Sequence, residues 1–439
     1  MKLKTFKRGV HPNGNKHYTC EKPVQELVIK GEAVYPVSQH IGAPCEVIVE
    51  VGEKIKVGQM VAKASSFVSA NIFSAVSGTV KAIEPRHALM GETCLSVVID
   101  NDGLFQTVED YGKEQDYTTL TKEQILEKIS YAGIVGLGGA GFPTHVKLSP
   151  SNPEEIDHII INSAECEPYL TSDHRVMLER TQDFLVGCDI LLRLFDNAKC
   201  VVGIENNKMD AYNKINVENT NPRIETALLK AKYPQGGERM LIKAITAREI
   251  NSKMLPAAAG CVVVNAASVV AIYEAVCKNI PLIKRIMTLT GDAITNPCNL
   301  LVSIGTNHLE LLEAAGGFNC EPEKVVSGGP MMGTSLFSLD FPVTKTSSSI
   351  LAFAKDDVAK CDPSNCIHCG RCLGACAEGL VPQLLMAAAD NNQFDEFERL
   401  GGMECIECGS CGYVCPAKRP LTQSFKFAKR KVIANRKKS

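Results

Sequence analysis

Eight cysteines near the end of the chain fall into two sets with the same internal spacing. The first set occupies CIHCGRCLGAC (Cys366, Cys369, Cys372 and Cys376), and the second occupies CIECGSCGYVC (Cys405, Cys408, Cys411 and Cys415). In each set the pattern Cys-x2-Cys-x2-Cys-x3-Cys brings three thiols close together and places a fourth slightly beyond them. Three such thiolates fit three corners of a cubane, and the fourth then reaches a neighbouring cubane. The sequence therefore predicts a small domain that holds two [4Fe–4S] clusters.

The predicted ligand sets exchange their fourth members, as in bacterial two-cluster ferredoxins. One cluster is held by Cys366, Cys369, Cys372 and Cys415, and the other by Cys405, Cys408, Cys411 and Cys376. The alternative is a pair of zinc sites, but zinc motifs usually combine two-residue spacings across a longer gap. The other cysteines, including Cys361, are expected to be bystanders. Two adjacent clusters imply that the protein transfers electrons one at a time.

We expect the chain to be neither exported nor membrane-spanning. Its first residues, MKLKTFKRGVHPNG, contain no apolar signal core, so its 19 cysteines are expected to stay reduced in the cytoplasm. The longest uncharged run, Pro256–Tyr273, is interrupted by Pro, Gly, Asn and Ser. This favours a buried strand (Cys261–Val264) followed by a buried helix over a membrane span. The net charge of −2 gives no general attraction to nucleic acid.

A chain of 439 residues is too long for one hydrophobic core, and its residue pattern changes along its length. From 31 to 100, Val and Ile alternate between glycine turns, which predicts short strands in a barrel-sandwich-like fold. This stretch resembles biotinyl and lipoyl domains without their modified lysine, so we expect a scaffold. From about 120 to 280, strand and helix patterns alternate, which predicts an α/β layer with a largely parallel sheet. The expected strands are Asp157–Asn162, Lys199–Ile204 and Cys261–Val264, and the expected helices are Thr121–Tyr131, Gln182–Phe195 and Ala267–Lys278.

The C-terminal part is expected to contain two more domains and a basic tail. Residues 283–345 read as strand, strand, helix, strand, which is typical of a small β-grasp unit, and residues 355–425 should be mostly helical. From Pro416 to the end there are nine Lys or Arg residues and no acidic ones. This segment either docks on a partner or anionic lipid or is a disordered end. The expected borders are 1–115, 116–280, 281–345, 346–425 and 426–439.

A glycine-rich loop in the α/β region, GIVGLGGAGFPTHVK (Gly133–Lys147), precedes an expected helix. Such a loop lets backbone N–H groups approach a phosphate or a flat ring that side chains would block. Its glycines are too closely spaced for the G-x-G-x-x-G dinucleotide fingerprint. From the loop alone, a nucleotide site and a tight packing turn are equally good interpretations.

The loop resembles the flavin and NADH loop of the NADH-binding subunit of respiratory complex I, in which an arginine usually stands at the position of Leu137. NSAECEP (162–168), YPQGGER (233–239) and VVVNAAS (262–268) follow in that family's order. The similarity covers about residues 120–415. Four further stretches, FKRGVHPNGNKHYT, VSQHIGAPCEVIVEVGEKIKVGQ, AECEPYLTSDHRVMLE and YPQGGERMLIKAIT, resemble the C subunits of the Rnf complex, an ion-translocating ferredoxin:NAD+ oxidoreductase.

The resemblance implies a site for non-covalent FMN that takes NAD(H) as substrate. The flavin and dinucleotide would be lined by Gly136, Gly138, Gly139, Ala140 and Gly141, with Phe142 stacked on a nucleotide ring. Asn162 and Glu165 would hydrogen-bond the flavin, Asn265 would hold its phosphate end, and the nicotinamide would face Tyr233, Gly236, Gly237 and Glu238. The expected catalytic residues are Glu238 and Lys147, the latter beside the electron-rich edge of the flavin. Leu137 in place of arginine removes one charged contact, which leaves the mode of phosphate binding open. Each side chain also has a structural interpretation: Phe142 as core, Lys147 and Glu165 as surface charges.

The implied fold is a multidomain α/β protein. It would combine a β-rich barrel-sandwich-like N-terminal domain, a Rossmann-like FMN/NADH domain, a β-grasp (SLBB-like) unit and a helical ferredoxin-like two-cluster domain. The implied function is that of an oxidoreductase component, peripheral on the cytoplasmic side of the cell membrane, that exchanges hydride between NAD(H) and FMN and passes single electrons through the clusters. Its implied partners are the membrane-spanning subunits of an Rnf-type complex and, through one of them, ferredoxin. The alternatives are a protein like the cobalamin reductase of diol-utilising microcompartments and a non-catalytic electron-transfer subunit.

Overall fold

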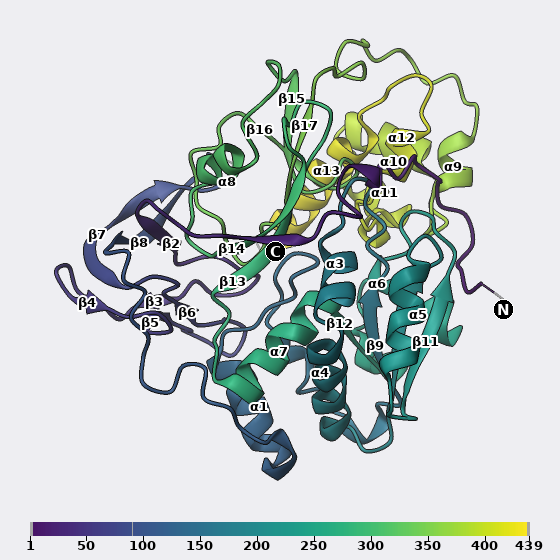
Figure 1. Ribbon diagram of the computed structural model, residues 1–439. Helices are drawn as coiled ribbons and strands as arrows, with labels where there is room; N and C mark the ends of the chain where they lie inside the picture. Colours follow the sequence, from purple (N-terminus) through teal and green to yellow (C-terminus); the bar gives the residue numbers. More distant parts are fainter. Residues whose placement is uncertain (1–2, 90, 437–439) are drawn as a thin grey trace.

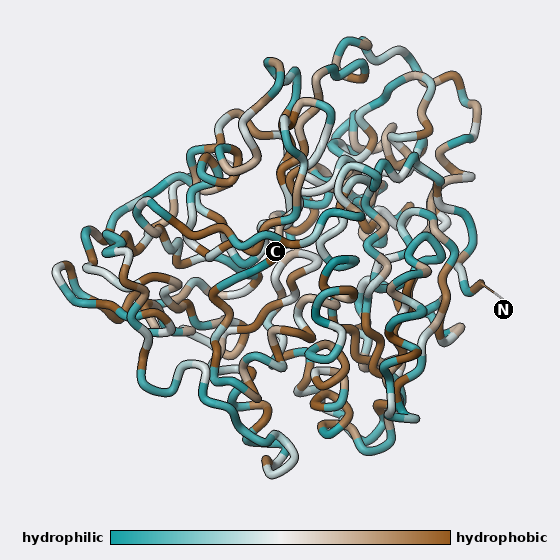
Figure 2. Tube along the Cα trace, in the orientation of Figure 1, coloured by the Kyte–Doolittle hydropathy of each residue, from teal (hydrophilic) through white to brown (hydrophobic). Residues whose placement is uncertain are grey.

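The computed structural model describes residues 3–89 and 91–436. Four units follow one another along the chain: a β-rich N-terminal unit, an α/β unit, a six-stranded sheet and a helical C-terminal unit (Figure 1). Hydrophobic stretches gather along the parallel sheet and the helices beside it (Figure 2). This multidomain α/β organisation is the predicted fold class.

The N-terminal unit is a sandwich of two small antiparallel sheets, with strand orders β2-β8-β7-β4 and β3-β5-β6. The strands are β2 (Ala33–Pro36), β3 (Glu46–Val47), β4 (Lys54–Ile55), β5 (Met60–Lys63), β6 (Ile72–Phe73), β7 (Gly78–His87) and β8 (Thr93–Asn101). Ile55 and Val97 from one sheet share a hydrophobic core with Val61 and Ile72 from the other. The alternation of Val and Ile therefore predicted this sandwich correctly.

The α/β unit is built on a four-stranded parallel sheet with the order β11-β10-β9-β12. The strands are β9 (His158–Ser163), β10 (Lys199–Glu205), β11 (Ile224–Leu229) and β12 (Cys261–Asn265). One face is covered by α6 (Glu238–Thr246), and the other by α1 (Lys122–Tyr131), α4 (Thr181–Leu194), α5 (Met209–Glu218) and α7 (Ala266–Lys278). Because helices cover both faces, the strands are apolar almost throughout. The predicted strands and helices of this unit agree with the structure to within one residue at each end.

The uncharged run Pro256–Tyr273 forms a 3-10 turn (Pro256–Ala259), strand β12 and the first part of α7. The prediction of a buried strand that turns into a buried helix is therefore confirmed. In the two described stretches of the chain, no helix combines the length and the apolar character needed to cross a membrane.

The third unit is a six-stranded sheet with the order β1-β14-β13-β17-β15-β16. Its elements are β1 (Val24–Leu27), β13 (Lys284–Thr290), β14 (Cys298–Ser303), α8 (His308–Ala314), β15 (Lys324–Ser327), β16 (Thr334–Leu336) and β17 (Ser349–Phe353). The predicted order strand, strand, helix, strand corresponds to β13, β14, α8 and β15. Strand β1 comes from the N-terminal part of the chain and lies parallel to β14 at the sheet edge. The segment Val24–Leu27 is therefore tied to this sheet.

The C-terminal unit consists of short helices followed by one longer helix. They are α9 (Arg371–Ala375), α10 (Pro382–Asp390), α11 (Phe394–Arg399), α12 (Ser410–Tyr413) and α13 (Leu421–Arg436). Helix α13 crosses residue 426, where a basic tail was expected to begin. Its residues Phe425, Ala428 and Val432 form a buried stripe, so the interpretation of a disordered end is wrong for 421–436. Residues 437–439 of that expected tail lie outside the described residues.

Residues 4–19, here called the N-terminal strap, run over the α/β unit and reach the C-terminal unit. The N–H of Lys4 donates to the carbonyl of Leu228 at 2.9 Å, and Val10 and Tyr233 exchange two backbone hydrogen bonds of 2.8 and 2.9 Å. The N–H of Gly9 donates to the carbonyl of Ala375 at 3.2 Å. The strap therefore joins the loop after β11 to the helices that carry the first cysteine set.

Candidate functional site

A cavity of about 780 Å³ lies where the carboxyl ends of β9 and β12 meet the six-stranded sheet and the C-terminal unit. Asn162 and Asn265 line it from the strand ends, Met332 and Ser348 from the six-stranded unit, and Cys408 from the C-terminal unit. The volume lies within the roughly 300–1,000 Å³ typical of ligand pockets. Ligands of parallel α/β sheets usually bind at the carboxyl ends of the strands. The cavity is therefore the candidate nucleotide site.

The glycine-rich loop forms one wall of this cavity. Gly138, Gly139 and Ala140 line it, and the turn is fixed from behind by Ser268, whose Oγ accepts from the N–H of Leu137 at 3.0 Å. A Cβ added at Gly138 would lie 2.5 Å from Nδ2 of Asn265, so a larger residue would displace that side chain. The turn therefore presents bare backbone to the cavity, which suits a flat ring or a phosphate.

The structure brings most of the predicted nucleotide-site residues to the cavity. Those that line it are Gly138, Gly139, Ala140, Asn162, Glu165, Tyr233, Gly236, Gly237, Glu238 and Asn265. Gly136, Gly141, Phe142 and Lys147 are not part of the lining. The N–H of Gly136 donates to the carbonyl of Phe142 at 2.9 Å, so these two residues close the turn behind its exposed glycines. The half-buried side chain of Phe142 lies outside the cavity.

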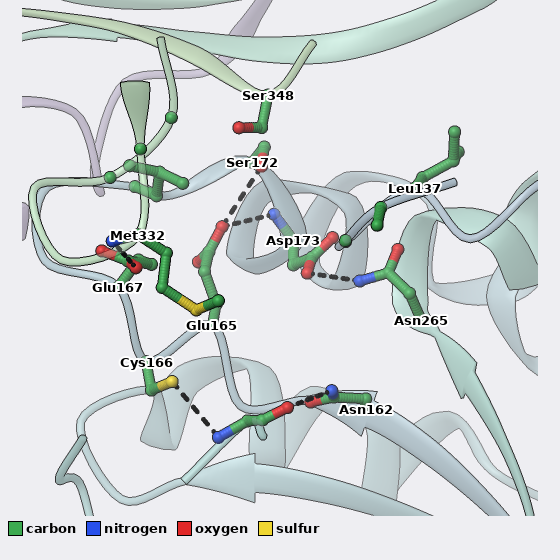
Figure 3. Close-up of a pocket in the computed structure, with 18 of the residues that line it drawn as sticks. Leu137, Asn162, Glu165, Cys166, Glu167, Ser172, Asp173, Asn265, Met332 and Ser348 are labelled. Carbon is green, nitrogen blue, oxygen red and sulfur yellow. Dashed lines mark hydrogen bonds between the residues drawn. The ribbon is translucent and has the colours of Figure 1, made fainter. Parts of the chain in front are cut away.

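At one end of the cavity, two helix N-termini and two carboxylates are linked by hydrogen bonds (Figure 3). Asn265 caps α7 by accepting from the N–H of Ala267 at 3.0 Å, and its Nδ2 donates to Asp173 at 2.8 Å. Glu165 accepts from the N–H of Asp173 at 2.7 Å, in the first turn of α3 (Ser172–Glu179). Burial, with a smaller contribution from the charge of Glu165, raises the pKa of Asp173 to about 7.

At the other end, residues 162–168 hold two loops in place. Glu167 accepts from the N–H groups of Met331 and Met332 at 3.1 and 2.9 Å, and burial raises its pKa to about 7. Cys166 Sγ accepts from the N–H of Gly236 at 3.2 Å, while Nδ2 of Asn162 donates to the carbonyl of the same residue at 2.8 Å (Figure 3). The loop after β11 and the loop after β15 are therefore both fixed by the segment that follows β9.

The two expected catalytic residues form an ion pair. Nζ of Lys147, at the end of α2 (Thr144–Lys147), lies 3.3 Å from Oε1 of Glu238 and also donates to the carbonyl of Val263 at 3.3 Å. Glu238 lines the cavity from the first turn of α6, whereas Lys147 stands behind it. Lys147 can therefore influence the cavity only indirectly, through its ion pair with Glu238.

Two smaller cavities lie in the C-terminal unit, and each is lined by one predicted foursome of cysteines. One cavity is lined by Cys366, Cys369, Cys372 and Cys415, and the other by Cys376, Cys405, Cys408 and Cys411. Among residues 3–89 and 91–436, no three His, Cys, Asp or Glu side chains are grouped as ligands of a single metal ion. The two foursomes of thiols are recognised instead by the cavities that they line. Burial raises the pKa of Cys405 to about 11 and that of Cys411 to about 12, and a bound cluster would favour their thiolate forms.

The large cavity and the second cysteine cavity share a wall. Cys408 and Ile406 line both of them. The thiols of Cys366 and Cys369, by contrast, lie on exposed residues at the surface. The cysteine foursomes are therefore arranged as an inner site against the large cavity and an outer site toward solvent.

Several lining residues were not predicted from the sequence. Glu167 and Asp173 lie inside stretches that carry the family resemblance. The same motifs that predict a role for Glu165 could therefore have pointed to these two residues. Arg285 and Met332 come from the six-stranded unit, more than a hundred residues away from the glycine loop, and no local pattern marks them.

Family models match the chain in the order of its structural units. They are the RnfC Barrel sandwich hybrid domain at residues 4–104, the Nuo51 FMN-binding domain at 129–274, the SLBB domain at 286–335 and the 4Fe-4S dicluster domain at 359–416. The match to the FMN-binding domain includes the glycine turn and both asparagines of the cavity.

Similar curated proteins cover nearly the whole chain. The C subunit of the proton-translocating ferredoxin:NAD(+) oxidoreductase complex of Clostridium ljungdahlii is 43% identical over 97% of this chain and 94% of its own length. The C subunit of the Na(+)-translocating ferredoxin:NAD(+) oxidoreductase complex of Acetobacterium woodii is 42% identical over 100% of this chain and 99% of its own. The C subunit of the ion-translocating oxidoreductase complex of Vibrio cholerae is 36% identical over 91% of this chain but only 52% of its own length.

Solved structures of NAD+-reducing [NiFe]-hydrogenase share the fold. The H2-reduced form has a TM-score of 0.50 and 19% identity over 73% of this chain and 62% of that chain. The air-oxidised form has a TM-score of 0.51 and 17% identity over 76% of this chain and 67% of that chain. At these identities the likeness concerns the fold alone.

Proposed function

Because the chain belongs to the family of C subunits of ion-translocating ferredoxin:NAD(+) oxidoreductase complexes, we propose that it exchanges hydride between NAD(H) and FMN and passes single electrons through two [4Fe–4S] clusters. The observation that carries this proposal is the wall shared by the large cavity and the inner cysteine site, formed by Cys408 and Ile406. A nucleotide-sized cavity in contact with a cysteine foursome gives paired electrons a short route to a one-electron carrier.

FMN, when bound, accepts two electrons as a hydride and gives them up singly, which is the chemistry that links a nicotinamide to an iron–sulfur cluster. The chain's own part is to bind and orient the reactants. The bare turn at Gly138 and Gly139 admits a ring or phosphate that side chains would exclude. We assign hydrogen bonds to the flavin ring or ribityl chain to Asn162 and Glu165, and contact with the phosphate end to Asn265. All three side chains line the cavity, which supports these assignments.

The nicotinamide side of the cavity is assigned to Tyr233, Gly236, Gly237 and Glu238. Glu238 is the catalytic candidate because it lines the cavity. Lys147 is a positioning residue in this proposal, since it acts through its 3.3 Å ion pair with Glu238. Phe142 lies outside the lining and receives no role.

With the cofactors bound, the inner cluster would exchange electrons with the flavin, and the outer one would connect it to the surface. The inner cluster, held by Cys405, Cys408, Cys411 and Cys376, adjoins the large cavity, while the outer ligands Cys366 and Cys369 are exposed. An exposed cluster is the natural place for electron exchange with another redox subunit. The partners of the chain are therefore the other subunits of the Rnf-type complex, and ferredoxin is reached indirectly through one of them.

We place the chain at the cytoplasmic side of the membrane, where NAD(H) and ferredoxin are available. It is a peripheral subunit in this arrangement, and ion transport belongs to its membrane-spanning partners. For the division of the chain we retain the borders 1–115, 116–280, 281–345 and 346–425, with 426–439 as a final basic segment, although α13 runs through the last border.

The test is an anaerobic NADH titration of the reconstituted full-length chain, followed by electron paramagnetic resonance. We expect NADH to bleach the flavin absorbance and to produce the signals of two reduced [4Fe–4S] clusters. In Cys408→Ser, which alters the shared wall, the flavin should still be bleached while cluster reduction by NADH is lost or strongly slowed. Cys361→Ser is the matched control, because this exposed cysteine lines neither cysteine cavity.

Two results would contradict the proposal. A chain that takes up both clusters but no flavin would be an electron-transfer subunit without its own hydride chemistry. A Cys408→Ser variant whose clusters are reduced by NADH as fast as those of the unmodified chain would show that electrons do not cross the shared wall.

A further inference from the structure

Arg285, on β13, is a buried guanidinium that lines the large cavity at the end formed by the glycine turn. It is 6% exposed. One terminal nitrogen donates to the carbonyl of Leu137 at 3.2 Å, and the other donates to the carbonyl of Lys345. Its Nε has no hydrogen-bond partner among the described residues. A buried cation with a free N–H is costly to keep, unless the site receives an anion.

No carboxylate neutralises Arg285 directly. Within the described stretches it takes part in no ion pair, and the acidic group that influences it, Asp173, is already hydrogen-bonded to Asn265 at 2.8 Å. Burial lowers the pKa of Arg285 only to about 10, so the guanidinium stays charged at neutral pH. Among the described residues, the guanidinium beside Leu137 is therefore paired with no carboxylate, and the charge that affects its pKa is that of Asp173.

Two other features of the same end favour an anion. The thirteen-residue helix α7 begins here, with Ala267 of its first turn on the cavity wall. The turn at Gly138 and Gly139 exposes its backbone to the same space. Since Asn265 already accepts from the N–H groups of Ala267 and Ser268, α7 favours an anion through its dipole, whereas the glycine turn can offer backbone N–H groups directly.

The two ends of the cavity also differ in what lies beyond them. Cys408 of the inner cysteine site lines the cavity together with Tyr233 and Gly236, which follow β11, whereas Arg285, on β13, contacts Leu137 of the glycine turn. A flavin whose ring exchanged electrons with the inner cluster would lie toward Cys408, and the glycine turn beside Arg285 would then be available to its phosphate.

We propose that Arg285 is the cationic contact for the phosphate of FMN. The six-stranded unit then supplies the charge that the glycine turn itself lacks at Leu137. This inference rests on the proposed function, because it takes the cavity as a flavin site. It assigns to this chain a phosphate-binding residue from a different structural unit.

The test compares two flavins that differ only in the phosphate. The full-length chain, with its clusters reconstituted and its flavin removed, is titrated anaerobically with FMN and with riboflavin, using the quenching of flavin fluorescence. The unmodified chain should prefer FMN. Arg285→Met should weaken FMN binding by about 10- to 100-fold, the range for a hydrogen bond to a charged group, and leave riboflavin binding unchanged. Arg285→Lys retains the charge and should retain most of the preference for FMN.

Lys345→Met is the matched control for loss of a buried cation. Nζ of Lys345 donates to the carbonyl of Gly133 at 2.7 Å, at the start of the glycine loop, but Lys345 does not line the cavity. Any damage to the loop should therefore weaken FMN and riboflavin equally in this variant. The ratio of the two affinities separates phosphate recognition from a structural role.

Three results would overturn the inference. An Arg285→Met variant with an unchanged ratio of FMN to riboflavin affinity would make the residue structural. An Arg285→Met variant that loses affinity for NADH but keeps its affinity for FMN would show that Arg285 contacts the dinucleotide instead of the flavin phosphate. If the unmodified chain bound FMN and riboflavin equally well, the phosphate contact would be ruled out but the proposed function would stand. If it bound neither flavin, the proposed function would be overturned as well.

Discussion

Single buried carboxylates control how the wall of the nucleotide cavity is built. Glu167 is the clearest case, because it accepts two N–H groups from the loop after β15 and one weak hydrogen bond from Tyr233 at 3.5 Å. Nζ of Lys16, from the N-terminal strap, donates to the carbonyls of Glu165 and Glu167 at 2.9 and 3.0 Å. The backbone around Glu167 is thus fixed from both sides, while its carboxyl remains in a poorly solvated place.

This environment predicts a pH dependence of stability. Burial raises the pKa of Glu167 to about 7, above its value in an unfolded chain, so the unfolded form loses the proton first. Its contribution to stability is therefore fully present below about pH 4.5 and is lost as the pH rises to 7, by up to roughly 3 kcal/mol. Asp173, whose pKa burial also raises to about 7, acts in the same direction.

We expect Glu167→Gln to flatten the pH dependence of the thermal unfolding midpoint between pH 5 and 7.5, measured by circular dichroism. Glu21→Gln, at an exposed position, is the control and should follow the unmodified chain. Equal slopes in the Glu167→Gln variant and the unmodified chain would show that this carboxyl does not titrate in the folded state as described.

The residue scale also shows what the sequence makes predictable. The cysteine foursomes were predicted from local spacing, because ligands of a cubane lie close together in the chain. The glycine turn and the two asparagines were found through motifs of a known family. Arg285 was not found, because its contact with Leu137 joins positions 148 residues apart, and such a contact leaves no local pattern. The same holds for Lys16, whose role depends on carbonyls about 150 residues away.

At the scale of elements, α13 connects the packing of the C-terminal unit to its inner cysteine foursome. Phe425 is 1% exposed and packs with Phe397 of α11 in the core of this unit. From the same helix, Nζ of Lys429 donates to the carbonyl of Cys405 at 2.8 Å and lies 2.9 Å from Glu407. The sequence showed this segment only as a basic tail, because the high count of Lys and Arg masks a narrow apolar stripe.

We expect Phe425→Ala to destabilise the C-terminal unit by about 3–5 kcal/mol, the usual cost of removing a large buried side chain. Clusters should then be lost at a lower temperature, as followed by the visible absorbance during anaerobic heating. Phe427→Ala is the matched control, since Phe427 lies two positions further along and is 47% exposed. If both variants lost their clusters at the same temperature, α13 would not be part of the supporting core.

At the scale of the whole molecule, the C-terminal unit is docked on the α/β unit beside the shared wall of the two cavities. Arg239, on α6 directly after Glu238, lies 2.9 Å from Glu404 and 3.4 Å from Glu378. Glu404 precedes the second cysteine set, and Glu378 follows the first. One guanidinium therefore holds the segments before Cys405 and after Cys376 against α6, whose first residue, Glu238, lines the large cavity.

Arg239→Gln should loosen this docking, since truncating one partner of a largely buried charge pair costs about 2–5 kcal/mol. We expect the clusters to be reduced more slowly by NADH in stopped-flow measurements, while dithionite, which reaches the exposed outer cluster directly, reduces them at the normal rate. Lys243→Gln is the control, because Lys243 lies one turn further on α6 and pairs only with Glu249 among the described residues. A normal rate with NADH in Arg239→Gln would mean that the docking does not depend on this residue.

The glycine loop is held by hydrogen bonds from the third unit: Arg285 donates to the carbonyl of Leu137, and Lys345 to that of Gly133. The α/β unit is consequently not a portable module. If the α/β unit were grafted alone into another redox protein, its glycine loop would lack the hydrogen bonds from the six-stranded unit that hold it. A successful chimera would need to contain both the α/β unit and the six-stranded unit.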